Sequence, residues 1–191
     1  NAGENVTGGN DVFIGYQTGF GSTGNSGANG SFNTVVGANA FFKNRTGATK
    51  NTIMGYTAGY WIYDGGSENV HIGYQSGYYA TGSYNTFVGS DAGKGGTTSA
   101  PYSSGTNNTA LGYQALKAFT TGYRNVAIGD RAGAQTTTGH SSVYIGHLAG
   151  YTATTGGGNV VIGGETYQNG NAGTAVVIGY AAGKTTSGGG D

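Results

Sequence analysis

The chain has no cysteine, a single proline and few charges, which make up only 8% of its 191 residues. Without cysteine it has neither a disulfide framework nor a thiolate metal site. Its eight basic residues are balanced by eight acidic ones, so no net charge attracts a polyanion and we expect no nucleic-acid partner. Because the sequence lacks a run of about 18 apolar residues, we also expect no insertion into a membrane.

Glycine is abundant instead, with 42 copies, and it is accompanied by 15 tyrosines and 7 phenylalanines. Gly-rich chains are often disordered because they cannot bury enough apolar surface. Here 36% of the residues are hydrophobic, which is too much for a solvated linker. This composition predicts an ordered chain with a repeat architecture.

One short unit, Asn-(Thr/Val)-x-(Ile/Val/Leu)-Gly, recurs ten times at intervals of 16 to 23 residues. A constant strand-like unit with connectors of variable length is typical of a solenoid with loops on its surface. The unit ends in each copy at a turn glycine: Gly15, Gly37, Gly55, Gly73, Gly89, Gly112, Gly129, Gly146, Gly163 and Gly179.

The repeat predicts an all-β fold, a parallel β-solenoid or β-roll of about ten coils. We assign residues 10–183 to the solenoid, 1–9 to an N-terminal junction and 184–191 to a Gly-rich C-terminal tail. At about 4.8 Å per coil, the rod is on the order of 50 Å long.

Two columns of the unit are expected to form the inner core of the coil, because side chains alternate along a strand with period two. The first column directly precedes the glycine: Ile14, Val36, Met54, Ile72, Val88, Leu111, Ile128, Ile145, Ile162 and Ile178. The second lies two residues earlier: Val12, Thr34, Thr52, Val70, Thr86, Thr109, Val126, Val143, Val160 and Val176.

The middle column between them is also apolar except at His71: Phe13, Val35, Ile53, His71, Phe87, Ala110, Ala127, Tyr144, Val161 and Val177. A strand that is apolar on both faces is buried on both faces, and one narrow coil covers only one of them. We therefore expect the second face to pack on other copies of the chain in a closed symmetric bundle. The alternative is a flattened monomeric solenoid with an exposed apolar stripe.

Three further columns have structural explanations. Asparagine opens the strand in seven copies, and stacked side-chain amides hydrogen-bond along such a column. Three residues after each glycine stands Ala, Ser or Thr, which suggests a second short strand packed closely on the first. Tyrosine follows the glycine at Tyr16, Tyr56, Tyr74, Tyr113 and Tyr180, and we interpret these residues as a stacked ladder.

The segments Asn-Thr-Ala-Leu-Gly-Tyr-Gln-Ala-Leu (108–116) and Asn-Val-Ala-Ile-Gly-Asp-Arg-Ala-Gly (125–133) resemble head repeats of trimeric autotransporter adhesins and shaft repeats of phage tail fibres. The resemblance covers about residues 10 to 183. It implies a trimeric, left-handed, parallel β-roll that acts as an adhesive or receptor-binding fibre, extracellular, on a virion tail fibre or a bacterial cell surface. The coils here are longer and less uniform than the adhesin repeat of roughly fourteen residues, which favours the tail-fibre interpretation.

Aromatic side chains outside the repeat columns are the candidate ligand contacts, since sugar rings stack on such side chains. Cell-surface carbohydrate or another receptor is thus a possible partner beside the homotrimer itself. The alternative is that these aromatics only cover the edge of the solenoid or a groove between subunits. The candidates are Phe42, Arg45, Tyr60, Trp61, Tyr63, Tyr78 and Tyr79.

We expect no enzyme and no cofactor, because the eight carboxylates are scattered over different coils and repeat positions. The spacing of His71, His140 and His147 does not match a metal site, and we expect His71 to be hydrogen-bonded at an interface. If three copies met on an axis, three His71 side chains would face one another and bind an ion. Alternatives to the receptor-binding fibre are a purely structural extracellular filament and an ice-binding solenoid. The ice-binding hypothesis is disfavoured because threonines such as 136–138 cluster in loops instead of forming an outward column.

Overall fold

The computed structural model describes residues 2–4, 8–20, 30–43, 47–62, 65–97, 102–167 and 174–183. Each repeat unit forms one strand of three residues, and within the described residues no helix occurs. The strands are β1 (Val12–Ile14), β2 (Thr34–Val36), β3 (Thr52–Met54), β4 (Val70–Ile72), β5 (Thr86–Val88), β6 (Thr109–Leu111), β7 (Val126–Ile128), β8 (Val143–Ile145), β9 (Val160–Ile162) and β10 (Val176–Ile178).

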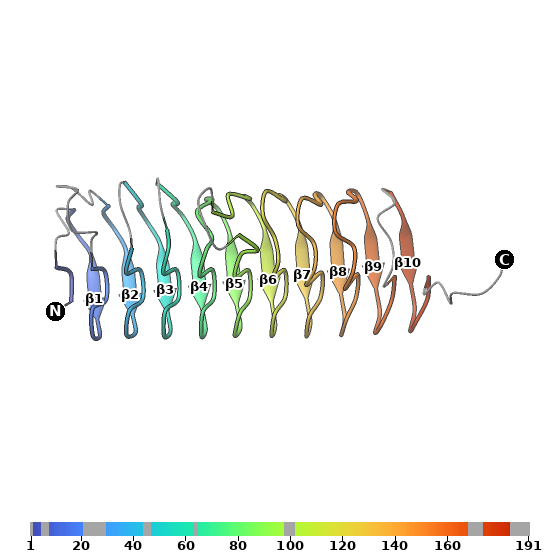
Figure 1. The fold of residues 1–191 in the computed structure, drawn as a ribbon, viewed down its shortest axis with the longest axis horizontal. Helices are drawn as coiled ribbons and strands as arrows, with labels where there is room; N and C mark the ends of the chain where they lie inside the picture. Colours follow the sequence, from blue (N-terminus) through green and yellow to red (C-terminus); the bar gives the residue numbers. More distant parts are fainter. Residues whose placement is uncertain are drawn as a thin grey trace.

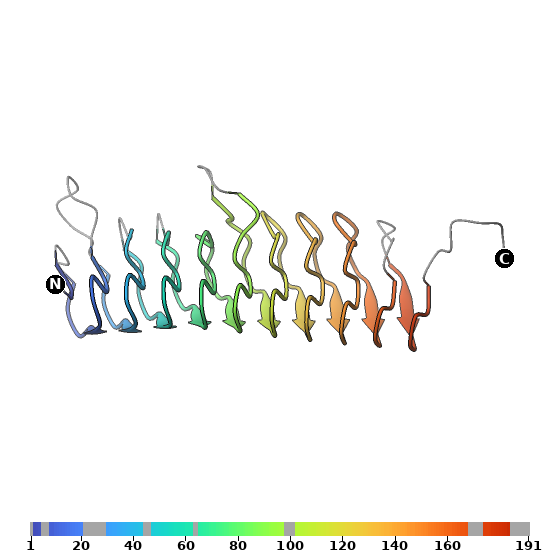
Figure 2. The same cartoon turned by 60° about the horizontal axis from the view of Figure 1, so that its bottom comes forward.

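The ten strands form one parallel sheet in sequence order, one strand per coil, along the length of the rod (Figure 1). Pairing is in register, so that Val35 lies opposite Ile53 and Ile53 opposite His71. Each position of the repeat therefore becomes a column that follows the rod, with the strands along one side and the connecting segments above them (Figure 2). The predicted parallel β-solenoid is confirmed. None of the described residues belongs to a helix that is long and apolar enough to cross a membrane.

The middle column of the strands, not the two flanking columns, points into the coil. Val35, Ile53, Phe87 and Tyr144 of this column are fully buried, whereas Ile14 in a flanking column is 58% exposed. The prediction that the flanking columns form the inner core was therefore wrong. The alternation has the expected period of two, but a strand that is apolar on both faces carries no contrast that tells the inner face from the outer one.

Side chains inside the coil compensate one another in size. The residue four positions after the turn glycine faces the middle column: a Cβ at Gly93 would lie 2.3 Å from the Phe87 ring. In three coils with a smaller middle residue the facing residue is larger, as in Ala110 with Leu116, which are both fully buried in one cluster. At Ala127 the facing residue, Gly133, is also small, and a Cβ there would meet the side chains of Leu116 and Tyr144 from the neighbouring coils. Large side chains therefore fill the space left by small ones, either in the same coil or in a neighbouring one.

The predicted amide column is present as a buried ladder. In its repeating geometry, the backbone N–H and the side-chain Nδ2 of Asn51 both donate to Asn33 Oδ1, at 3.0 and 3.1 Å. Asn51 Nδ2 also donates to the carbonyl of Gly66 at 3.0 Å. Equivalent bonds continue through Asn69, Asn85, Asn108 and Asn125. The ladder satisfies buried polar groups that would otherwise destabilise the coil.

The turn glycines have φ between +128° and +139°, a region that side chains rarely adopt. Except at Gly179, a Cβ would also lie 2.3 to 2.6 Å from the carbonyl oxygen of the turn glycine in the next coil. The small residues three positions after the turn glycines are buried, except Ala182, but they form turns. The second strand predicted there is therefore absent from the described residues. Backbone bonds such as Phe41 N–H to Ala58 O, at 3.0 Å, still join these turns from coil to coil.

Candidate functional site

Four aromatic rings from consecutive coils stack along one side of the solenoid. Phe20, Phe42, Tyr60 and Tyr78 each stand five residues after a turn glycine, and the stacking of coils aligns them. Neighbouring ring centres are 5.2, 5.1 and 4.9 Å apart, with interplanar angles of 14°, 23° and 7°. These are stacking contacts of ordinary length, so the rings form one continuous row.

Three further rings join this row. Tyr102, in the long connection between β5 and β6, stacks on Trp61 at 5.2 Å and on Tyr79 at 5.9 Å. Edge contacts link these rings to the row, from Tyr60 to Trp61 at 5.4 Å and from Tyr78 to Tyr79 at 4.6 Å. We call the seven residues the aromatic ridge: Phe20, Phe42, Tyr60, Trp61, Tyr78, Tyr79 and Tyr102.

The ridge is partly buried and carries a cation. Lys43 Nζ lies 5.2 Å from the centre of the Phe42 ring and 6.0 Å from that of Trp61, within the range of cation–π attraction. Partial burial raises the pKa of the Tyr60 and Tyr78 hydroxyls above its usual value, so both stay neutral at physiological pH. Trp61 also hydrogen-bonds the side chain of Tyr78.

The structure brings five of the seven sequence-predicted ligand contacts, Phe42, Tyr60, Trp61, Tyr78 and Tyr79, into this ridge. The other two, Arg45 and Tyr63, lie outside the described residues, as does the tail 184–191. Phe20 and Tyr102 are members that the sequence did not predict. The 23-residue interval between Gly89 and Gly112 was the available signal for Tyr102, because the extra length returns over earlier coils.

Most ring faces in the ridge are covered by other rings, which limits the chemistry available there. A sugar ring that stacks on an aromatic residue needs a free face, and the row of stacked rings offers mainly edges and hydroxyl groups. Since stacked pairs contribute about 0.5–1.5 kcal/mol beyond burial, the ridge also stabilises the coils that it connects.

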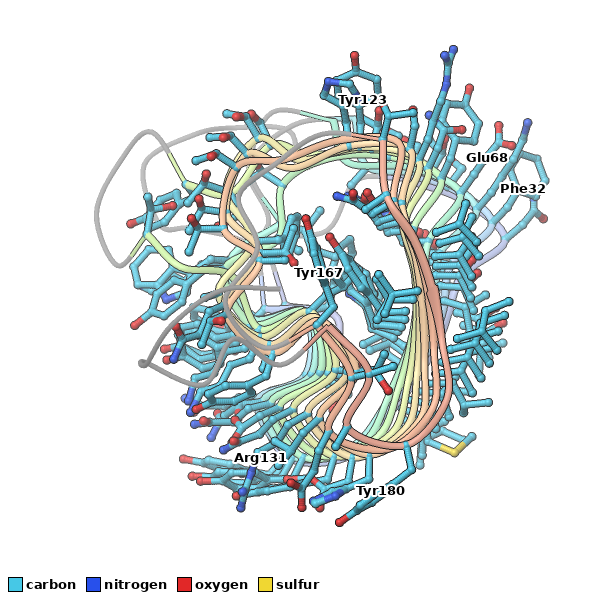
Figure 3. The ribbon with its side chains drawn as sticks, turned by 90° about the vertical axis from the view of Figure 1, so that its right-hand side faces the viewer. Phe32, Glu68, Tyr123, Arg131, Tyr167 and Tyr180 are labelled. Atoms are coloured by element: carbon cyan, nitrogen blue, oxygen red, sulfur yellow. The ribbon has the colours of Figure 1, made fainter. Side chains whose placement is uncertain are left out.

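A second candidate surface is the outward side of the sheet, formed by the two flanking columns of all ten strands. We call it the outward face. It carries branched apolar side chains with threonine in four strands, and Ile14, Leu111 and Ile178 are exposed. In the view along the rod, its side chains stand in two straight rows beside the sheet (Figure 3). A contiguous apolar surface of this kind usually marks an interaction site.

Two rows of residues border the outward face, one on each edge (Figure 3). The entry row precedes each strand by two residues: Asn10, Phe32, Lys50, Glu68, Tyr84, Asn107, Arg124, Ser141, Gly158 and Thr174. The exit row follows each turn glycine: Tyr16, Ala38, Tyr56, Tyr74, Ser90, Tyr113, Asp130, His147, Gly164 and Tyr180. The exit row contains the five tyrosines that were predicted to form a stacked ladder. Only Tyr56 and Tyr74 occupy consecutive coils, and they stack at 5.8 Å with an angle of 9°, so the predicted ladder is limited to this pair.

His71 lies inside the coil, completely buried, with its ring stacked on Phe87 at 5.1 Å. Burial lowers its pKa to about 3, so it is neutral at physiological pH. Both ring nitrogens lack a hydrogen-bond partner. The interface role and the ion site on a common axis are therefore ruled out, because the coil itself encloses the ring.

The other histidines are on the surface. His140 stacks on Tyr123 at 4.9 Å, and His147 Nε2 lies 3.8 Å from Asp130 Oδ2. Within the described ranges, no three His, Asp or Glu side chains gather closely enough to hold a metal ion.

Comparison of the chain with protein-family models, with curated proteins and with solved structures gives no match. The likeness to tail-fibre and adhesin repeats therefore rests on the repeat unit alone.

Proposed function

We propose that the chain is a structural fibre segment that assembles with other copies of itself through the outward face. The observation that supports this most directly is the continuity of that face, which runs unbroken over all ten strands. Burying apolar surface contributes about 25 cal/mol per Å². Because every coil contributes apolar surface to the outward face, burying it along the whole rod against an equivalent face adds this free energy coil by coil and favours lengthwise association.

A closed assembly with its symmetry axis along the rod uses this face fully, because each copy then buries it against its neighbours and none is left exposed. Three copies is the number that the adhesin and tail-fibre repeats suggest. The same resemblance suggests an extracellular place, on a virion tail fibre or a bacterial surface.

Neighbouring residues of β7 test this proposal. Ala127 is fully buried inside the coil, whereas Ile128 is partly exposed on the outward face. We expect Ile128→Asp to give a folded monomer with an unchanged circular dichroism spectrum, because its carboxylate stays in water. The matched variant Ala127→Asp places the charge inside the coil and should be insoluble or unfolded. An Ile128→Asp protein that keeps the native mass of the wild type would contradict the proposal.

Receptor contact through the aromatic ridge is a second candidate function. It is favoured by the departure of Trp61 and Tyr102 from the repeat pattern, since side chains that only fill a coil should recur in every copy. The ligand class proposed is host-surface carbohydrate, held by ring edges, hydroxyl groups and Lys43.

Glycan-array binding by Trp61→Ala tests this candidate. Tyr151→Ala is the control, because Tyr151 also stands five residues after a turn glycine but lies in the coil of β8, far from the ridge. Loss of binding in Trp61→Ala alone, with an unchanged melting curve, would support receptor contact. If neither variant changes binding while Trp61→Ala lowers the melting temperature, the ridge is a structural clamp.

Ice binding is the alternative for a chain that stays monomeric. The sequence-based argument against it was partly wrong, because Thr34, Thr52, Thr86 and Thr109 do face outward. The remaining strands carry valine in that column beside a bulky aliphatic column. Thermal hysteresis of the wild-type chain, abolished by Thr52→Lys, would establish this alternative.

A further inference from the structure

The two rows that border the outward face compensate each other within a coil. Phe32 of the entry row shares its coil with Ala38 of the exit row, and Tyr84 shares its coil with Ser90. Where the exit row carries tyrosine, the entry row carries Asn, Lys, Glu or Thr, so no coil has Phe or Tyr at both edges. A large side chain at one edge is thus always matched by a small or polar one at the other.

One coil also carries opposite charges at its two edges, whereas Lys50 and Glu68 of the entry row pair with each other within the chain at 3.4 Å. Asp130 is the one acidic residue of the exit row, and the entry row of the same coil carries Arg124. Both side chains are exposed. Within the chain, Arg124 lies over the Tyr123 ring at 5.8 Å, and Asp130 is 3.6 Å from Arg131 and 3.8 Å from His147. Such exposed pairs are weak, which leaves the Asp130 carboxylate available to a second cation.

Contacts inside one chain do not account for this compensation. Phe32 and Ala38 are six residues apart with strand β2 between them, a span of about 20 Å in extended chain. They lie at opposite edges of the face, as the positions of Phe32 and Tyr180 show (Figure 3). Inside the coil, by contrast, compensating residues such as Phe87 and Gly93 touch directly. Two rows that compensate each other in side-chain size without touching within one chain are best explained by contact between chains.

Symmetry decides which chain supplies that contact. Rotation about an axis along the rod brings the entry row of one copy against the exit row of the next, at the same coil. An antiparallel pair would instead oppose entry row to entry row and exit row to exit row with the coils in reverse order. Ala38 would then face Gly164 across a gap, and Tyr16 would face Tyr180.

We infer that neighbouring copies pack in parallel and in register, with Phe32 seated on Ala38, Tyr84 on Ser90 and Arg124 paired with Asp130 of the next copy. This inference rests on the proposed self-assembly and adds the residue contacts that fix its direction and register. The apolar face drives association but is similar in every coil, so it does not select one register. The bordering rows differ from coil to coil and select it.

Cysteine pairs test the register directly, since the chain has no cysteine of its own. A disulfide needs Cα atoms within about 7 Å, so Phe32→Cys with Ala38→Cys cannot close within one coil. We expect this double variant, after mild oxidation or treatment with a short bis-maleimide, to give a covalent oligomer on a denaturing gel. Phe32→Cys with Ser90→Cys is the control, offset by three coils or about 14 Å, and should stay uncrosslinked.

The pair Tyr16→Cys with Tyr180→Cys reports the opposite orientation. Its residues belong to the first and last coils, so they meet only between antiparallel copies. Crosslinking of this pair, or of the offset control, by an oligomeric protein would overturn the inference while leaving self-assembly intact. A monomeric protein with no crosslink in any variant would refute self-assembly, and the inference with it.

Charge reversal tests the third contact. We expect Arg124→Asp and Asp130→Arg each to weaken assembly at least tenfold, measured as the concentration at which the oligomer dissociates. The double variant should recover most of the loss, and the effect should shrink in high salt because exposed charges are screened. A double variant that is as weak as the sum of the two single variants would contradict the Arg124–Asp130 contact.

Discussion

At the scale of single residues, the turn glycines are the positions at which the fold tolerates substitution least. Gly129 combines φ of +131° with a position where a Cβ would lie 2.6 Å from Gly146 O in the next coil. Gly179 has nearly the same φ, +130°, but its Cβ would meet only Ala182 Cβ at 3.6 Å. A substitution at Gly179 therefore introduces backbone strain alone, whereas the same substitution at Gly129 adds a collision with the neighbouring coil.

We predict that Gly179→Ala lowers the free energy of unfolding by about 1–3 kcal/mol, the cost of the disfavoured φ. Gly129→Ala should cost several kcal/mol more, because the coils must also move apart. Denaturant unfolding of the two variants measures the difference. Equal losses would mean that the close approach of the coils does not constrain this column.

His71 is the other residue that the fold constrains strongly, because its ring is buried with two unpartnered nitrogens. Burial lowers its pKa from 6.5 to about 3, so the unfolded chain binds a proton between these pH values while the folded chain does not. The effect of His71 on the free energy of unfolding is therefore constant above pH 6.5. As the pH falls from 6.5 toward 3, this group lowers the free energy of unfolding by roughly 1.4 kcal/mol per pH unit.

We predict that His71→Phe raises the free energy of unfolding at pH 7 by about 1–3 kcal/mol, since the buried unpaired polar atoms disappear. It should also flatten the fall in stability between pH 6 and 4. His140→Phe is the control: its ring is exposed and stacked on Tyr123, so the acid sensitivity should persist. A His71→Phe protein with the wild-type pH profile would show that the acid sensitivity has another source.

At the scale of the elements, the asparagine ladder joins strands that are each only three residues long. Asn108 accepts two hydrogen bonds from Asn125 at its Oδ1 and donates from Nδ2 to Asn85 and to Gly122 O. Ser142 occupies the same column in β8's coil and still accepts from the Asn159 N–H at 3.1 Å. Serine therefore keeps the backbone part of the ladder.

We predict that Asn108→Ala lowers the free energy of unfolding by several kcal/mol, because buried donors and acceptors on both sides lose their partners. Asn108→Ser should cost about half as much, since its hydroxyl replaces the acceptor for the Asn125 N–H. Thermal or denaturant unfolding gives the ranking. If Asn108→Ser lowered the free energy of unfolding as much as Asn108→Ala, the stabilisation by the ladder would come from the side-chain amide contacts alone.

The sequence predicted the strands, their pairing and the ladder because these features repeat at fixed positions. It did not reveal which face is inside. Val126, Ala127 and Ile128 are all apolar, so alternation alone does not distinguish the inner column. The sequence did carry a partial signal, because in several coils the residue four positions after the turn glycine compensates the middle residue in size, as in Phe87 with Gly93 and Ala110 with Leu116.

Part of the candidate site was also predictable. Trp61 and its neighbours depart from the repeat, which marked them before their contacts were known. The stacking partner Tyr102 was not predictable, because the path of the long connection after β5 is set by packing and not by the repeat. The interior position of His71 was not predictable for a different reason. It depends on which face of the strand points into the coil, and the apolar residues on both faces did not show this.

At the scale of the whole molecule, the apolar residues of the strands lie on two surfaces, one inside the coils and one along the outward face. The interior is closed within a single chain by compensating side chains, ladders and turns. The outward face is not closed, and the rows at its edges vary from coil to coil. A rod of this kind is suited to assemble lengthwise with copies of itself.

The native mass of the wild-type chain, measured by light scattering over a range of concentrations, tests this account most directly. It predicts a stable species of three times the 19.1 kDa chain mass, with no monomer at micromolar concentration. A monodisperse monomer would contradict it, because the outward face would then be in water along its whole length.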